Sequence, residues 1–544
     1  MHPLIFPFVN FQNYRFGRNS DPREGTFNQN KCMRVLSICL LLISVCSSAQ
    51  TDLIYRNLPV GKYAVGFKIF TITDPSRISK PQLNYLGEKI DGDRRRKITI
   101  HLWYPAQIGT SGSALTYADY CYSSLLTSTN ETISSDQKDA EVNRARRAVE
   151  NWWGKTSDEA WLKLMGTKML AQPEIEPMEG KFPLLVGMLR PLSTTITNEL
   201  LASNGYVVAM IKPENRPTFA GAALDDIPDM RFAIVELQKN KNVDGEKIGT
   251  FGFSGSGFSQ VLFAMNDYRI KAVADIESGI YMDGLFEGFS ESNYYRPGKM
   301  RAHFLHIFSV DLSKQEKFID EFYNKAKFTQ RYRLIVNQPA LHHWDFASEG
   351  YTSCVVLKIR GAQQENIERA FKIASLYLVN FFNAKLKNEN EAAKFLSNKP
   401  AMENVQDSLW SFSDLPAFKA APDREAFEYI IRTKGIDEAV NVVKNTIKED
   451  TTTDIMKWFM LNSLGYNFLG EQKYKEAIGV FKLNTELHPD DPNLFDSLAE
   501  GYEQSGDKEN MKKTSAIVMD ILNKKTTLTD AEKGLKSNAE RRLK

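Results

Sequence analysis

Short apolar runs alternate with helical patterns through the middle of the chain, and this alternation limits the fold more than any other feature. The runs have the length and the branched or aromatic residues of buried strands. They cover residues 182–188, 206–211, 247–253, 270–276 and 302–308, and helical patterns over 197–205 and 229–240 separate the first three. Strands that alternate with helices are typical of a mostly parallel sheet covered by helices on both faces. We therefore predict an α/β fold with such a sheet.

A glycine- and serine-rich turn follows the third of these runs. Its residues, Gly252-Phe253-Ser254-Gly255-Ser256, have the spacing of a nucleophile elbow, in which a serine lies on a sharp turn between a strand and a helix. Larger side chains two positions before or after that serine would collide with the strand or the helix. Gly252 and Ser256 are both small, although glycine is usual at the second position. We predict that Ser254 is a nucleophile and that the N–H group of Gly255 faces a developing oxyanion.

A serine nucleophile needs a general base, and the favoured chain order in such a fold is serine, acid, histidine. The chain has seven histidines, five of which follow the predicted nucleophile. His303 and His306 lie inside an apolar run, and His488 lies far toward the C-terminus. His342 and His343 lie in a loop directly after a further strand-like run. We predict His343 as the base, in preference to His342.

The acid that would orient the histidine has two placements on the residues alone. One follows the run 270–276 and offers Asp275 or Glu277, and the other follows the next run and offers Asp311, the commoner position. Because side chains alternate along a strand, Asp275 and Glu277 are expected on one face of the sheet. The pattern does not separate them.

Residues from about 55 to 385 resemble the platelet-activating-factor acetylhydrolase and dienelactone-hydrolase-like branch of the α/β hydrolases. The matching segments are 61–67, 98–106, 182–186, 201–217, 252–256 and 342–348. The resemblance implies a serine carboxylic-ester hydrolase that acts on a small-molecule or lipid-like ester without a cofactor. In that branch a histidine precedes a phenylalanine by three residues, as His343 precedes Phe346, and the acid comes early. The resemblance therefore ranks Glu277 first and Asp311 second.

The segment after the first apolar run departs from this branch. The branch has a His-Gly pair there, whose N–H groups complete the oxyanion hole, whereas this chain reads Gly-Met-Leu-Arg-Pro over 187–191. Pro191 has no N–H group to donate. Leu189 or Arg190 is expected to supply the second donor, and turnover is expected to be slowed.

Residues 135–172 change to an amphipathic helical pattern. We interpret them as an insertion in a hydrolase domain over 51–385, where they would form a lid over the pocket. Trp152, Trp153 and Trp161 would then line an apolar acyl site, with ordinary packing expected for at least two of them.

The strand-like runs stop near residue 385, and residues 386–420 read as a linker, with a loose helix as the alternative over their first part. Glycines recur about 35 residues apart, at Gly435, Gly470 and Gly506. Small Gly465 and Ala477 would let two helices approach closely, with Phe481 filling the gap. We predict tetratricopeptide-like helical repeats over 421–544, which would dock a protein partner or a second copy of the chain.

Residues 33–49 have the charged start, apolar stretch and small residues of a secretory signal, preceded by an unpatterned extension over 1–32. We therefore expect a protein exported to the periplasm or the outside, with a lipid anchor at Cys46 as the weaker alternative. Cys121 and Cys354 would remain, either paired or as buried free thiols. No Cys/His cluster has metal-ligand spacing.

The charge of the chain argues against one class of partner but does not choose between the possible functions. A formal net charge of +2 gives no reason to expect nucleic-acid binding. Two alternatives to an esterase stay open: a peptidase or amidase on the same fold, and a catalytically weak scaffold whose repeats bind a partner.

Overall fold

The computed structural model describes residues 53–79, 87–89, 92, 94–107, 113–213, 219–280, 284–309, 322–336, 341–397, 410–448, 450 and 453–544, and every structural statement below concerns these residues. The predicted extension, the predicted signal segment with Cys46, and Asp311 lie outside them.

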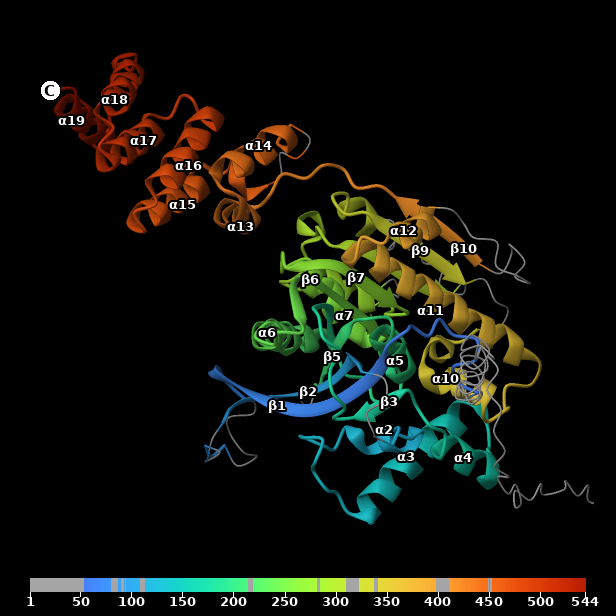
Figure 1. The fold of residues 1–544 in the computed structure, drawn as a ribbon. Coiled ribbons are helices and arrows are strands. Elements are labelled where there is room, and N and C mark those ends of the chain that lie inside the picture. The colour runs from blue at the N-terminus through green and yellow to red at the C-terminus, as the bar shows by residue number, and fades with distance from the viewer. Residues whose placement is uncertain are drawn as a thin grey trace, which may run out of the picture. The chain divides into compact units, whose positions relative to one another are not determined.

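A ten-stranded sheet forms the centre of the part of the chain before residue 416, in the order β10-β9-β8-β7-β6-β4-β5-β2-β1-β3 (Figure 1). The strands are β1 (Ala64–Ile78), β2 (Arg95–Ala106), β3 (Ala171–Pro173), β4 (Phe182–Met188), β5 (Val207–Ile211), β6 (Val243–Phe253), β7 (Ile270–Ile276), β8 (His303–Ser309), β9 (Arg331–Val336) and β10 (Trp410–Leu415). The six strands from β9 to β5 in that order are parallel to one another. Strand β10 pairs antiparallel with β9, and β2 pairs antiparallel with β5. The predicted α/β class is confirmed.

Helices cover both faces of this sheet, because alternate residues of each strand are apolar toward opposite sides. On β8, Leu305 and Ile307 join the core under one set of helices, whereas Phe304 and Phe308 join the core on the other face. The first set is α5 (Thr195–Ser203), α10 (Ser348–Val355), α11 (Gln364–Leu386) and α12 (Asn390–Ser397). The second set is α6 (Phe219–Leu237), α7 (Gly255–Ala264) and α8 (Leu285–Ser290).

The parallel strands bring the candidate site residues to one edge of the sheet. Ser254 directly follows β6, Glu277 directly follows β7, and His343 lies in the segment after β9. Because the carboxyl ends of parallel strands meet at the same edge, residues far apart in the chain become neighbours there.

The predicted insertion is helical and packs onto the same core. It contains α3 (Ser135–Trp153) and α4 (Asp158–Met165), and α2 (Tyr117–Ser123) precedes it. Val149 of α3 and Leu164 of α4 belong to the core under α5 and α11. The insertion is thus part of the sheet domain's packing.

The structure corrects part of the predicted linker over 386–420. Residues 390–397 form α12 on the sheet domain, in line with the helical alternative, whereas residues 410–415 form β10, the edge strand beside β9, which was not predicted. Trp410 is buried against Tyr377, with ring centroids 5.4 Å apart. The strand was missed because polar residues fill most of its other positions, as edge strands allow.

The described residues between 421 and 544 hold helices and no strand (Figure 1). They are α13 (Arg424–Lys434), α14 (Ile436–Thr446), the short 3-10 helix η6 (Asp454–Met456), α15 (Trp458–Gly470), α16 (Tyr474–Leu487), α17 (Pro492–Ser505), α18 (Lys508–Asn523) and α19 (Asp530–Leu543). A Cβ atom on Gly465 would lie 2.3 Å from the Phe481 ring, so α15 and α16 approach closely there. The assignment to tetratricopeptide repeats stays a prediction.

No helix in the described ranges is both long and apolar enough to span a membrane.

Candidate active site

Ser254 lies on a strained turn between β6 and α7. Its φ angle is +57°, in a region that residues other than glycine seldom adopt. The turn is held by the Ser254 N–H group, which donates to the Ile276 carbonyl at 2.9 Å, and by the Gly257 N–H group, which donates to the Ser254 carbonyl at 2.8 Å. These bonds fix the serine between the end of β7 and the first turn of α7.

The small neighbours of Ser254 are required by the space around them. A Cβ atom on Gly252 would lie 2.7 Å from the Gly257 nitrogen and 2.8 Å from the Ser256 carbonyl carbon, and neither backbone atom can move freely. Ser256 is fully buried, and its hydroxyl donates to the Phe253 carbonyl at 2.6 Å. Serine replaces the usual glycine at this position without leaving a buried hydroxyl unbonded.

His343 reaches Ser254 from the segment after β9. Its Nε2 atom lies 2.9 Å from the Ser254 Oγ atom, and its ring stacks on Phe253 with centroids 4.9 Å apart. The neighbouring His342 is exposed, and its N–H group donates to the Asp345 carboxylate at 2.8 Å. Of the two candidate bases, the structure places His343 against the serine.

Glu277 lies on the other side of the imidazole. Its Oε2 atom is 3.4 Å from the His343 Nδ1 atom, and its side chain is 1% exposed. Its Oε1 atom accepts a hydrogen bond from the Ser309 N–H group at the end of β8. The three candidates Ser254, His343 and Glu277 thus form one chain of hydrogen bonds, whereas Asp311 lies outside the described residues.

The expectation that Asp275 and Glu277 share a face is wrong. Strand β7 ends at Ile276, and Glu277 has a φ angle of +51°, so strand alternation no longer applies to it. Asp275 accepts a hydrogen bond from the Ser278 hydroxyl at 2.6 Å and lies 3.4 Å from His306 Nε2. Burial raises the pKa of Asp275 to about 8 and lowers that of His306 to about 3. These two residues form a separate buried cluster.

The predicted oxyanion donors differ in their availability. Gly255 is the first residue of α7, and the first N–H groups of a helix have no partner within it. The prediction that Leu189 supplies the second donor is wrong, because its N–H group donates to the Ile211 carbonyl of β5 at 2.7 Å. Arg190 follows Leu189 in the chain, and its role as the second oxyanion donor stays a prediction.

Two aromatic side chains, Phe253 and Trp344, contact the imidazole, and the sequence patterns had assigned neither of them to the site. Trp344 lies 5.2 Å from the His343 ring and 5.7 Å from the Phe253 ring, measured between centroids. Trp152, at the end of α3, lies 5.6 Å from Trp344 and is 61% exposed. The other two insertion tryptophans have packing roles: Trp161 is buried in the core, and Trp153 lies under the Arg360 guanidinium.

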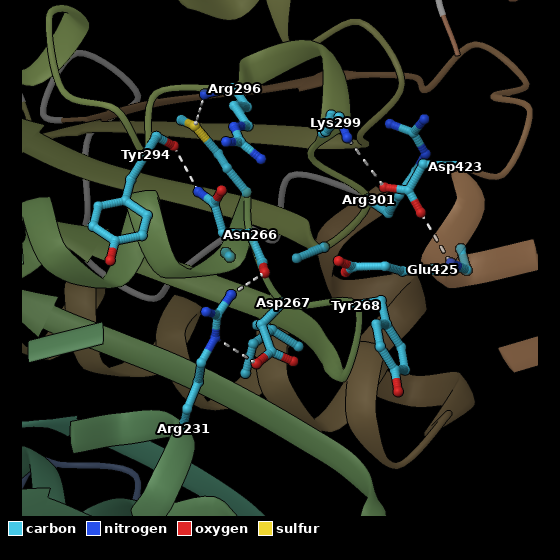
Figure 2. A pocket seen from close by; sticks show the side chains of 15 residues that line it. Arg231, Asn266, Asp267, Tyr268, Tyr294, Arg296, Lys299, Arg301, Asp423 and Glu425 are labelled. Atoms are coloured by element: carbon cyan, nitrogen blue, oxygen red, sulfur yellow. Dashed lines mark hydrogen bonds and ion pairs between the residues drawn. The ribbon is translucent and has the colours of Figure 1, made fainter. Parts of the chain in front are cut away.

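A separate cavity of about 250 Å³ lies beside the start of α13 and is lined by none of the three candidates (Figure 2). Some of its charged side chains pair with one another. Arg231 lies 3.4 Å from Asp267, and Lys299 lies 3.9 Å from Asp423. This cavity has a mixed charge and holds no arrangement of nucleophile and base.

Within the described part of the chain, no three or more His, Cys, Asp and Glu side chains are arranged to hold a metal ion. Cys121 and Cys354 are both buried free thiols.

Comparison with known proteins gives likenesses in structure and none in sequence. No family model matches the chain, and no curated protein matches it. Among solved structures, the chain is similar to a ferulic acid esterase from Streptomyces cinnamoneus, with 18% identity and a TM-score of 0.43, over 65% of this chain and 97% of that one. At that identity and TM-score the likeness says nothing about this chain's substrate.

Proposed function

We propose that this protein is an exported serine hydrolase of the α/β-hydrolase type that cleaves carboxylic esters. The observation that supports this most is the hydrogen-bonded series of Ser254 Oγ, His343 Nε2, His343 Nδ1 and Glu277 Oε2. A nucleophile, a base and a carboxylate in this order form the arrangement that activates serine for acyl transfer.

In the proposed reaction, the Ser254 Oγ atom attacks the ester carbonyl carbon while its proton passes to His343 Nε2. The carbonyl π electrons move to the carbonyl oxygen, which becomes the oxyanion beside the Gly255 N–H group. Collapse of this intermediate breaks the bond to the alcohol, which leaves with the proton from His343. A water molecule then repeats the sequence on the acyl-serine and releases the acid.

Glu277 would keep the imidazole in the useful tautomer. Its buried carboxylate accepts from His343 Nδ1–H and from the Ser309 N–H group, so that the carboxylate is fixed before substrate arrives. The negative charge then stabilises the imidazolium that forms in each half-reaction.

The second oxyanion donor would come from the Arg190 N–H group. Removal of one such donor costs about 10²- to 10³-fold in kcat in serine hydrolases. Because Leu189 is already bonded within the sheet, a slow enzyme is expected unless Arg190 supplies the bond.

The insertion would form one wall of the substrate site. Trp344 lies against the His343 ring, and the exposed Trp152 lies against Trp344, so the two rings offer an apolar contact surface that begins at the candidate base. The substrate would therefore be a small-molecule or lipid-like ester with an apolar group on this side.

The helices of 421–544 would dock a protein partner as tetratricopeptide-like repeats. Trp458 and Phe459 at the start of α15 are exposed, and Trp458 lines a groove of about 760 Å³ with Leu487, Pro489 and Leu535. Exposed aromatic side chains in a groove are typical of surfaces that bind other chains.

Hydrolysis of p-nitrophenyl acyl esters by the purified protein tests the proposal, with Ser254→Ala as the matched control. We expect turnover that is lost in the variant, and faster cleavage of esters than of aminoacyl anilides. Faster anilide cleavage would instead indicate a peptidase or amidase. Equal rates of ester hydrolysis for the wild type and Ser254→Ala would contradict the hydrolase proposal and leave only the partner-binding role.

A further inference from the structure

A buried ion pair lies directly behind the turn that carries His343. The Arg360 guanidinium donates two hydrogen bonds to the Asp345 carboxylate, one from Nη1 to Oδ1 and one from Nη2 to Oδ2 at 3.1 Å. The two side chains are 7% and 0% exposed. A two-point bond between planar groups fixes their relative orientation as well as their distance.

Asp345 also closes the turn that carries His343, through two hydrogen bonds with His342. Its carboxylate accepts the His342 N–H group at 2.8 Å, and its own N–H group donates to the His342 carbonyl at 2.9 Å. Helix α10 presses against the same turn, because a Cβ atom on Gly350 would lie 2.1 Å from the Trp344 carbonyl oxygen. The position of the turn is therefore set by Asp345 and by the packing of α10.

Arg360 connects this turn to the insertion. Its guanidinium lies over the Trp153 ring, 5.3 Å from the centroid, while it bonds Asp345. Trp153 is the last residue of α3 and adjoins Trp152 at the edge of the site. Contacts therefore run without a break from the end of the insertion helix to the turn that carries the candidate base.

The hydrogen bond between the His343 imidazole and Glu277 is weak. The 3.4 Å separation between His343 Nδ1 and Glu277 Oε2 is at the long end for a hydrogen bond, and the His343 side chain is 36% exposed. Its orientation toward Ser254 therefore depends on the backbone that carries it.

We propose that Asp345 and Arg360 are positioning residues, which hold the His343 turn so that Nε2 meets Ser254 and which link that turn to the insertion helix through Trp153. This role rests on the proposed function. Neither residue touches the reacting atoms, so the predicted effect is on turnover and not on substrate binding.

Loss of this anchor should displace the imidazole by a fraction of an ångström or more. A misplacement near 1 Å can cost about 100-fold in rate, so we expect Arg360→Ala to lower kcat by about 10- to 100-fold with KM changed less than about twofold. Trp153→Leu, which removes the cation–π contact but keeps an apolar side chain against the core, should lower kcat by about 2- to 5-fold. Arg369→Ala, on helix α11 and paired with Glu365 on the helix surface, is the matched control.

The experiment measures kcat and KM for p-nitrophenyl acetate, with active serines counted by a fluorophosphonate so that unfolded protein does not contribute. Guanidinium chloride is then added at about 20 mM, far below the molar concentrations that unfold proteins, with sodium chloride as the control. Guanidinium should partly restore kcat of Arg360→Ala by occupying the vacated site beside Asp345. Arg360→Lys and Asp345→Asn keep the size of each side chain and serve if the alanine variant does not fold.

The expected result is a lowered kcat per active serine in the Arg360 and Asp345 variants, an unchanged KM and rescue by guanidinium alone. Wild-type kcat per active serine in all of these variants would overturn the positioning role. A rise in KM with kcat unchanged would also overturn it, because Arg360 would then act on binding. A wild-type protein that is neither labelled nor active would overturn the proposed function and this role together.

Discussion

The Nε2 atom of His343 lies 2.9 Å from the Oγ atom of Ser254, although 89 positions separate the two residues in the chain. Both residues reach this contact from the carboxyl edge of the parallel sheet, Ser254 directly after β6 and His343 in the segment after β9. Glu277, after the intervening β7, lies on the far side of the imidazole. The predictions below test what this arrangement does and how the surrounding structure supports it.

Replacement of Glu277 by glutamine should remove most of the turnover. Glutamine keeps an acceptor for the Ser309 N–H group but no longer favours the useful tautomer, and the equivalent change in a serine protease costs about 10⁴-fold in kcat. Steady-state hydrolysis of p-nitrophenyl acetate gives the measurement. Asp275→Asn is the control and should lose less than about tenfold, since Asp275 does not contact His343. An equal loss in the two variants would contradict the assignment of Glu277.

Asp275 should make the stability of the protein depend on pH. Its folded pKa is raised by burial from 3.8 to about 8, so its favourable contribution is complete below pH about 4 and is lost as the pH rises through about 8. Asp275→Asn stays neutral, and it should therefore gain stability relative to the wild type, by at least about 1 kcal/mol, between pH 5 and pH 8. Urea unfolding at both pH values measures this difference. A constant difference would show that Asp275 is ionised throughout.

Gly252→Ala should destabilise the fold and abolish turnover. The new methyl group would meet backbone atoms of residues 256 and 257 at less than 3 Å, and such overpacking costs about 1–3 kcal/mol. Gly534→Ala is the matched control, because open space surrounds that residue within helix α19 and alanine should stabilise the helix by up to about 1 kcal/mol. Thermal unfolding of both variants gives the comparison. An unchanged melting temperature for Gly252→Ala would contradict the described turn.

Cys121 and Cys354 should resist thiol reagents in the folded protein. Burial raises the pKa of both thiols to about 12, so almost none of either is thiolate at pH 8. Titration with a chromogenic disulfide reagent should find neither thiol before denaturation and both afterwards. If neither reacted even in denaturant, the two residues would be joined by a disulfide.

Much of the sheet domain followed from patterns in the sequence. The apolar runs correspond to β4 to β8, because fully buried parallel strands have few polar residues. Strand β10 was missed because its exposed edge tolerates Ser411, Ser413 and Asp414. The pairing of that strand with β9 depends on contacts across more than 70 residues, which periodicity does not reveal.

Some residues of the candidate site could be predicted from the sequence, and others could not. Ser254 and His343 stand in local patterns, a small-residue turn and a loop after a strand. The residue pattern did not separate Asp275 from Glu277, and only the resemblance ranked Glu277 first. The positive φ angle that sets Glu277 apart from the strand is not indicated by any pattern. The N–H group of Leu189 is engaged because of the register between neighbouring strands, and the Arg360–Asp345 pair forms only in the folded chain.

The most direct test of the account is reaction of the folded protein with a fluorophosphonate, followed by mass spectrometry of its peptides. The arrangement predicts a single adduct on Ser254, which is absent in Ser254→Ala and forms far more slowly in His343→Ala. Absence of any adduct on the folded wild-type protein, or labelling of another serine that persists in Ser254→Ala, would contradict it.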